Sequence, residues 1–188
     1  MSSRDGRSFH RWKEAFIRPG MPEEDYWVKH DNFQNWGIVE TTSDLGVPQL
    51  SFYVFEGPQD AWLGRRPRIE RHITRFRLHT VRIDRFVSLN APLDGGECVT
   101  RPIVFEGDEL ALNFSTSAAG CVRVEIQDGN GKPVNGFRLN ECPRILGNKI
   151  KHIVKWKNGS DVNKLAGRPI RIRFELRDAD LFSFRFIE

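Results

Sequence analysis

Three stretches decide the fold: residues 105–116 (FEGDELALNFST), 121–137 (CVRVEIQDGNGKPVNGF) and 170–186 (IRIRFELRDADLFSFRF). In each stretch apolar side chains alternate with others, so one face of an extended strand can be buried while the other meets water. Residues 128–131 (DGNG) interrupt the second stretch with residue types that tolerate positive φ, which is typical of a tight turn. The pattern predicts a mostly β protein built on an antiparallel, jelly-roll-like β-sandwich.

The first third of the chain has a different composition. Four of the five tryptophans lie there, among Pro and Gly residues that punctuate short segments. Residues 43–48 (SDLGVP) predict a turn, and residues 49–55 (QLSFYVF) predict a strand. We therefore expect turn-rich β-structure with large aromatic side chains in this part.

A basic and apolar alternation from residue 68 to residue 89 leads toward the sandwich. We accordingly expect two parts, a β-rich segment over residues 1–67 and a β-sandwich over residues 68–188. Helix signals are few. Residues 160–167 (SDVNKLAG) predict one helical turn that begins at a Ser or Asp cap and ends at Gly167.

Charge and hydropathy exclude some partners. The 29 basic and 25 acidic side chains give a net charge of +4 and are mostly interleaved, as in residues 69–86 (IERHITRFRLHTVRIDRF). Interleaved charges suit solvated strands better than a phosphate-binding patch, so nucleic acid is not an expected partner. No apolar stretch approaches the roughly 20 residues that span a bilayer, and the first residues lack the apolar centre of a signal peptide. We expect a soluble chain, cytoplasmic as given, or exported if a signal peptide lies upstream.

The cysteines Cys98, Cys121 and Cys142 are odd in number and show no CxxC spacing. A complete disulfide framework and a zinc site are therefore both poorly supported, and buried free thiols are expected. A Cys121–Cys142 bridge remains the alternative.

Several segments together carry a resemblance to a known class of enzyme. They are residues 3–6 (SRDG), 14–20 (EAFIRPG), 37–41 (GIVET), 50–53 (LSFY), 82–91 (RIDRFVSLNA), 95–97 (GGE), 122–137 (VRVEIQDGNGKPVNGF) and 160–186 (SDVNKLAGRPIRIRFELRDADLFSFRF). The chain resembles the C-terminal region of bacterial glycoside hydrolases that are similar to the clan of five-bladed β-propeller enzymes, which includes the invertase-like and arabinanase-like families. The resemblance implies that residues 1–67 are the last propeller strands and that the sandwich follows them.

Most of the propeller of the resembled enzymes has no counterpart in this chain. Hydrolysis of a glycosidic bond needs two carboxyl groups placed across one sugar, and in those enzymes they come from earlier blades. We therefore expect no glycosidase activity from the chain alone. The resemblance implies a non-catalytic part of a glycoside hydrolase that supports the catalytic propeller and contacts carbohydrate. A self-standing carbohydrate-binding module and a protein-interaction sandwich are the alternatives.

Candidate sugar-contacting residues come from the first part of the chain. The tryptophans Trp27, Trp36 and Trp62 are candidate stacking platforms, because a flat aromatic ring covers the apolar face of a pyranose; core packing is the alternative. His30 and Asp31 are candidates for the same sugar funnel, or else form a turn. Glu40 is a weak catalytic candidate, or else a strand carboxylate paired with an arginine. Edge strands of an incomplete blade also predict a homo-oligomer formed through this segment.

No cofactor is expected from the sequence. The weak candidates for a structural Ca²⁺ site are four residues with side-chain oxygens: Asp128, Asn130, Asp178 and Asp180. Residues 128–131 are spaced as a turn and lack the downstream Glu of a calcium loop, so a turn is the favoured interpretation.

Overall fold

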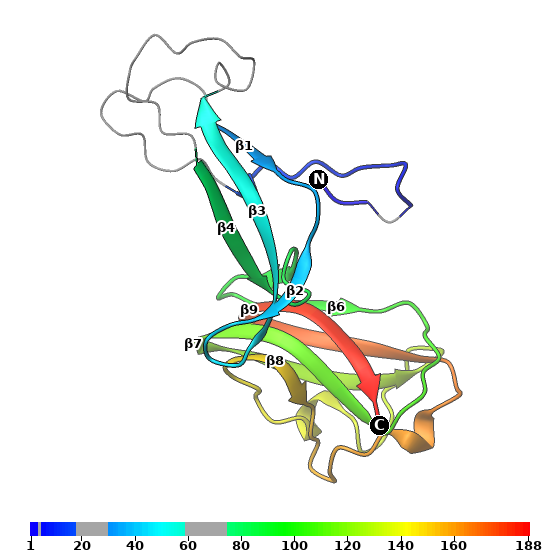
Figure 1. Ribbon diagram of the computed structural model, residues 1–188. Helices are drawn as coiled ribbons and strands as arrows, with labels where there is room; N and C mark the ends of the chain where they lie inside the picture. The colour runs from blue at the N-terminus through cyan, green and yellow to red at the C-terminus, as the bar shows by residue number, and fades with distance from the viewer. Residues whose placement is uncertain (4, 18–29, 59–74) are drawn as a thin grey trace. The chain divides into compact units, whose positions relative to one another are not determined.

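The computed structural model describes residues 1–3, 5–17, 30–58 and 75–188 and divides the chain into two units, Met1–Arg82 and Ile83–Glu188 (Figure 1). The elements described in these residues are antiparallel strands and two single-turn 3-10 helices. The predicted mostly β, antiparallel class is confirmed.

The first unit is a sheet organised around one long strand. Its strands are β1 (His30–Gln34), β2 (Val39–Thr42), β3 (Pro48–Pro58) and β4 (Arg75–Arg82). β1 and β2 follow each other along one edge of β3, and β4 pairs with the other edge. The expected strand at residues 49–55 and the turn before it are confirmed, because the Ser43 N–H donates to the Val47 carbonyl at 2.9 Å.

The two faces of this sheet differ in chemistry. Phe52 and Val54 are buried on one face, where the Phe52 ring stacks with the rings of Phe16 and His79, at centroid distances of 6.2 and 6.0 Å. The opposite face carries the alternate residues of β3, among them the exposed Tyr53. The period of two in β3 therefore leaves one polar and aromatic face open.

The boundary between the units lies at Arg82 and Ile83, not at the expected position after residue 67. Residues 75–82 of the alternation that we expected to lead into the sandwich instead form β4, which pairs with β3 from Gln49 to Glu56. His30 and Asp31 begin β1, so the turn that we considered for them is wrong. Their backbone is extended because it pairs with the last residues of β3.

The second unit is built on two long, bent strands, β7 (Glu109–Asp128) and β9 (Ile170–Ile187), which pair along most of their length. β5 (Leu89–Ala91) and β6 (Gly96–Val99) pair with the free edge of β9, and β8 (Asn148–Ile153) pairs with the free edge of β7. The single-turn helices are η1 (Leu139–Glu141) and η2 (Asn163–Leu165), of which η2 confirms the predicted helical turn.

β9 folds back on itself, which makes the second unit sandwich-like. Ten residues of extended strand span about 33 Å, yet the rings of Phe174 and Phe184 lie only 5.3 Å apart. The reversal occurs near Asp178, which has a φ of 41°, and opposite it the register with β7 shifts between Thr116 and Cys121. The two halves of β9 therefore face each other across one core (Figure 1).

The core follows the alternation of the three defining stretches. The apolar side chains of both halves of β7 are fully buried and belong to one cluster: Leu110, Leu112, Phe114, Val122, Val124 and Ile126. The loop side of the core is closed by Trp156, whose Nε1–H donates to the Val124 carbonyl at 3.0 Å. The predicted tight turn after β7 is also present, because the Gly131 N–H donates to the Asp128 carbonyl at 2.9 Å.

The three cysteines are free thiols in the structure, and Cys121 and Cys142 lie in different surroundings. Cys142 belongs to the core cluster, where its Sγ accepts a hydrogen bond from the Val124 N–H at 3.3 Å. Cys121 instead lines a surface pocket on the other face of β7. This separation favours the free-thiol interpretation over a bridge between them.

We expect Cys142 to resist iodoacetamide in the native chain near neutral pH. Burial raises the pKa of its thiol, and the hydrogen bond from Val124 offsets only part of that rise, so little of the reactive thiolate is present. Denaturation without reductant should allow all three cysteines to be alkylated, as measured by intact mass and peptide mapping. Two cysteines that stay unmodified after denaturation would instead reveal a disulfide.

Candidate functional site

The open face of the first unit carries a groove of about 630 Å³ between the β1–β2 turn and strands β2, β3 and β4. We call it the Trp36 groove. Its chemistry is set by two aromatic side chains, two aliphatic side chains and a row of three hydroxyls. These are Trp36 and Tyr53, Val39 and Leu78, and Thr41, Ser51 and Thr80. It therefore combines apolar surface with several short hydrogen-bonding groups.

Trp36 is the one sequence-predicted tryptophan that the described residues place in the groove. Its side chain is fully exposed, and Tyr53, 54% exposed, lines the same groove. Gly37 follows with a φ of 101°, which turns the chain from β1 into β2 after Trp36. Trp27 and Trp62 lie outside the described residues.

The hydroxyl row is fixed by the sheet register. Ser51 stands between Val39 of β2 and Thr80 of β4, so the three share one face. The hydroxyl oxygens of Thr41 and Ser51 lie 2.6 Å apart and are hydrogen-bonded. This bond holds two adjacent donors or acceptors at the floor of the groove without using their full capacity.

Of the other sequence candidates, Glu40 is not brought into the groove. Glu40 is exposed on β2, between Val39 and Thr41, and its strand position places it on the other face from those two groove residues. The backbones of His30 and Asp31 pair with the end of β3, at Pro58 and Gly57.

The four calcium candidates do not form one site. Asp128 Oδ1 accepts the N–H groups of two residues in its own turn, one of them Asn130, each at 2.9 Å, and Asp180 Oδ1 accepts hydrogen bonds from two side chains at 2.6 and 3.0 Å. Asp128 pairs with Ile170, about 25 Å along the strand from Asp178. Among the described residues, no group of three or more His, Cys, Asp or Glu could hold a metal ion.

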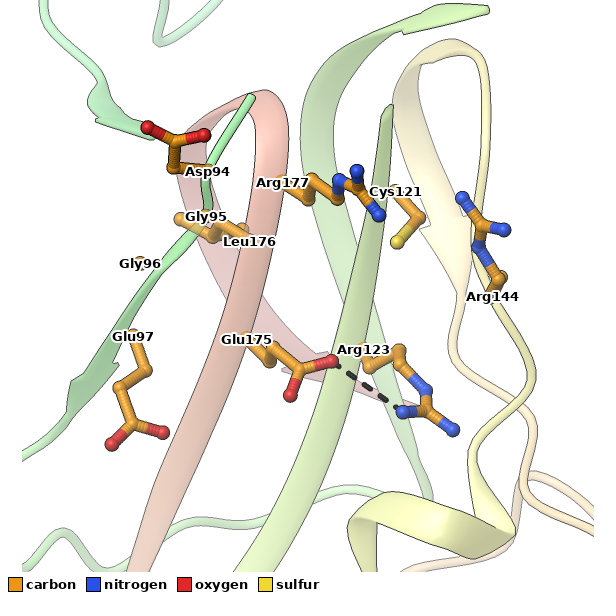
Figure 2. A pocket seen from close by; sticks show the side chains of 10 residues that line it. All are labelled: Asp94, Gly95, Gly96, Glu97, Cys121, Arg123, Arg144, Glu175, Leu176 and Arg177. Atoms are coloured by element: carbon orange, nitrogen blue, oxygen red, sulfur yellow. Dashed lines mark hydrogen bonds and ion pairs between the residues drawn. The ribbon is translucent and has the colours of Figure 1, made fainter. Parts of the chain in front are cut away.

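The second unit carries a separate pocket of about 510 Å³ on the outer face of β6, β9 and β7 (Figure 2). We call it the arginine pocket. The residues that line it are Asp94, Gly95, Gly96, Glu97, Cys121, Arg123, Arg144, Glu175, Leu176 and Arg177. Strand alternation places its charged side chains opposite the core residues of the same strands.

The floor of the arginine pocket is a grid of cross-strand neighbours. Glu97, Glu175 and Arg123 form one row across β6, β9 and β7, and Arg177 and Cys121 form the next. Like charges directly opposite each other repel, but both carboxylates are in ion pairs. Glu175 pairs with Arg123 at 3.4 Å, and Glu97 accepts a hydrogen bond at 2.8 Å from Arg173, whose pKa this bond raises.

Arg144 reaches the pocket from the loop between η1 and β8. The next residue, Ile145, is anchored by a two-way backbone bridge to Val122, each bond 2.9 Å long. Arg144 Nη2 also donates to the Ala119 carbonyl at 3.2 Å. The sequence did not predict this pocket: the alternation of β7 places Cys121 and Arg123 on one face, but the approach of Arg144 depends on a long-range contact.

Comparisons of the chain with models of protein families, with curated proteins and with solved structures found no match in any of the three. Among the residues that the structure describes, no helix is long and apolar enough to cross a membrane.

Proposed function

We propose that this chain is a non-catalytic carbohydrate-binding β-protein that holds an uncharged oligosaccharide in the Trp36 groove. The observation that carries the proposal is the fully exposed indole of Trp36 beside the hydroxyl row of β2, β3 and β4. An exposed tryptophan is costly to leave in water, and a ligand that covers it gains the burial of a large ring.

The chemistry of the groove matches that of a neutral sugar. The C–H face of a pyranose is apolar and packs on an indole or phenol ring, here those of Trp36 and Tyr53, while its hydroxyls need partners that both donate and accept hydrogen bonds. Thr41, Ser51 and Thr80 supply such groups. Binding of this kind needs neither a metal ion nor a cofactor.

The resemblance to the C-terminal region of glycoside hydrolases agrees with this role. In that setting the chain would accompany a catalytic propeller and hold its substrate, and it would supply no catalytic carboxylate. Glu40, the only catalytic candidate that the sequence suggested, lies outside the groove lining. We therefore propose binding without hydrolysis.

We expect Trp36→Ala to weaken binding about tenfold to whichever neutral glycan the chain retains best. One stacked ring is worth on the order of 1–1.5 kcal/mol, which corresponds to that factor. A glycan array of neutral plant and microbial oligosaccharides identifies the ligand, and calorimetry then compares the variant with the original chain. Trp36→Phe should keep most of the affinity, since it keeps a ring.

Leu45→Ala is the matched control, because Leu45 is also exposed in the first unit but does not line the groove. It should bind as the original chain does. Failure of the original chain to retain any neutral glycan would refute the proposal, and so would equal binding by Trp36→Ala.

A second candidate function is protein interaction through the same face, which the exposed apolar side chains of Val39, Tyr53 and Leu78 favour. Such a face suits a neighbouring blade or a second copy of the chain. Light scattering distinguishes the two: a dimer of the original chain that Leu78→Asp converts to a monomer supports the interface and argues against an open sugar groove.

A further inference from the structure

We propose that the arginine pocket of the second unit binds an oxyanion, a carboxylate, sulfate or phosphate group, between Arg144 and Arg177. The site is separate from the Trp36 groove, lies entirely within the second unit, and does not depend on the proposed sugar binding. Three observations carry the proposal: the balance of charges, the unused hydrogen-bond donors and the volume of the pocket.

The formal charges of the pocket cancel, but their pairing leaves one end cationic. Glu175 pairs with Arg123, and Glu97 pairs with Arg173, which lies outside the pocket and also pairs with Glu125. Among the described residues, no ion pair joins Arg144 or Arg177 to a carboxylate, and none joins Asp94 to a cation. In Figure 2 Cys121 lies between the side chains of Arg177 and Arg144, and Asp94 lies beyond Arg177, at the end of the pocket away from Arg144.

The arginines retain donors that the chain does not use. A guanidinium group carries five N–H donors; Arg144 spends one on the Ala119 carbonyl, and Arg177 spends its Nε–H on the Leu93 carbonyl at 2.9 Å. Arg123 Nε is buried and has no acceptor among the described residues. Buried donors are normally satisfied by protein, water or ligand, and the described residues supply no acceptor for this one.

The pocket is also preorganised and of suitable size. Each arginine side chain is held by a hydrogen bond that it donates to a backbone carbonyl oxygen. The Ile145–Val122 bridge also fixes the loop that carries Arg144. A volume of about 510 Å³ lies within the usual range for small-molecule sites and leaves room for more than a bare ion. Paired arginine forks favour the planar or tetrahedral oxygens of carboxylate, sulfate and phosphate groups.

Calorimetry on the full chain at constant ionic strength tests the proposal. The probes are inorganic phosphate, inorganic sulfate and glucuronate, with chloride and glucose as the matched ion and the matched neutral sugar. We expect saturable binding of at least one anion. We also expect its affinity to fall about tenfold in Arg144→Gln and in Arg177→Gln. Tighter binding of glucuronate than of the inorganic ions would assign the oxyanion to a sugar-borne carboxylate, and the reverse order would assign it to a free ion.

Two further variants separate the pocket from general charge. Arg185→Gln removes the same charge from an exposed position of β9 outside the pocket and should leave the affinity unchanged. Arg144→Lys keeps the charge but not the fork, and should retain part of the affinity. Absence of saturable binding to every anion overturns the proposal, and so does an equal loss for Arg185→Gln. Binding of neutral glycans tests the Trp36 groove, and binding of anions tests the arginine pocket. Either proposal can therefore fail without the other.

Discussion

Replacing Phe174 by alanine will lower the free energy of unfolding by about 3–5 kcal/mol, the largest effect that we expect in this chain. The Phe174 side chain is 1% exposed and packs on Phe184 in the opposite half of β9. Removing the ring leaves a cavity between the two halves of β9. Because the two halves belong to one continuous strand, they cannot move together freely to fill that cavity. Urea unfolding followed by far-ultraviolet circular dichroism measures the loss.

Val104→Ala provides the comparison, because Val104 is 62% exposed in the same unit. It should change the free energy of unfolding by less than about 0.5 kcal/mol. If Phe174→Ala proves no more damaging than this control, the two halves of β9 do not face each other across a shared core.

Gly120→Ala will destabilise the second unit by about 3 kcal/mol, although it adds only one methyl group. A Cβ atom at Gly120 would stand 2.3 Å from the Asp178 carbonyl oxygen and 2.6 Å from that of Arg177. Both atoms are backbone, so neither can rotate away, and the bend that reverses β9 would have to open. The same urea titration measures the effect.

Gly96→Ala is the matched control, because it adds the same methyl group at a position with room for it. The nearest atom to a Cβ there is that of Ala91, at an ordinary contact distance of 3.6 Å. We expect little change in stability for this variant. Equal midpoints for the two alanine variants would show that β7 and β9 do not approach so closely at the bend.

The two long strands of the second unit could be predicted because side chains alternate within each half of β7 and β9. The reversal of β9 could not, since no glycine or proline marks it; an aspartate adopts the positive φ instead. A signal was nevertheless present. Buried positions run through Ile172, Phe174 and Leu176 and then continue at Ala179 and Leu181, so the alternation changes phase by one residue at the bend.

The candidate sites were predicted less completely than the strands. Trp36 was identified from its residue type, but the hydroxyls beside it gather only because β2 and β4 flank β3 in a register that no local pattern specifies. The predicted boundary after residue 67 was wrong for the same reason. The alternation of residues 75–82 indicates that a strand forms, but it does not indicate which sheet that strand joins.

The pairing of β7 with β9 also sets the order in which the chain can fold. Glu109 pairs with Ile187 and Asp128 with Ile170, so the contacts between these strands link residues distant in sequence. Closing such long loops costs chain entropy before any contact repays it, and sheets of this kind fold slowly. On the ribosome, the apolar side chains of β7 emerge well before β9 exists to cover them. During that interval these side chains are exposed apolar surface of the kind that is prone to aggregate.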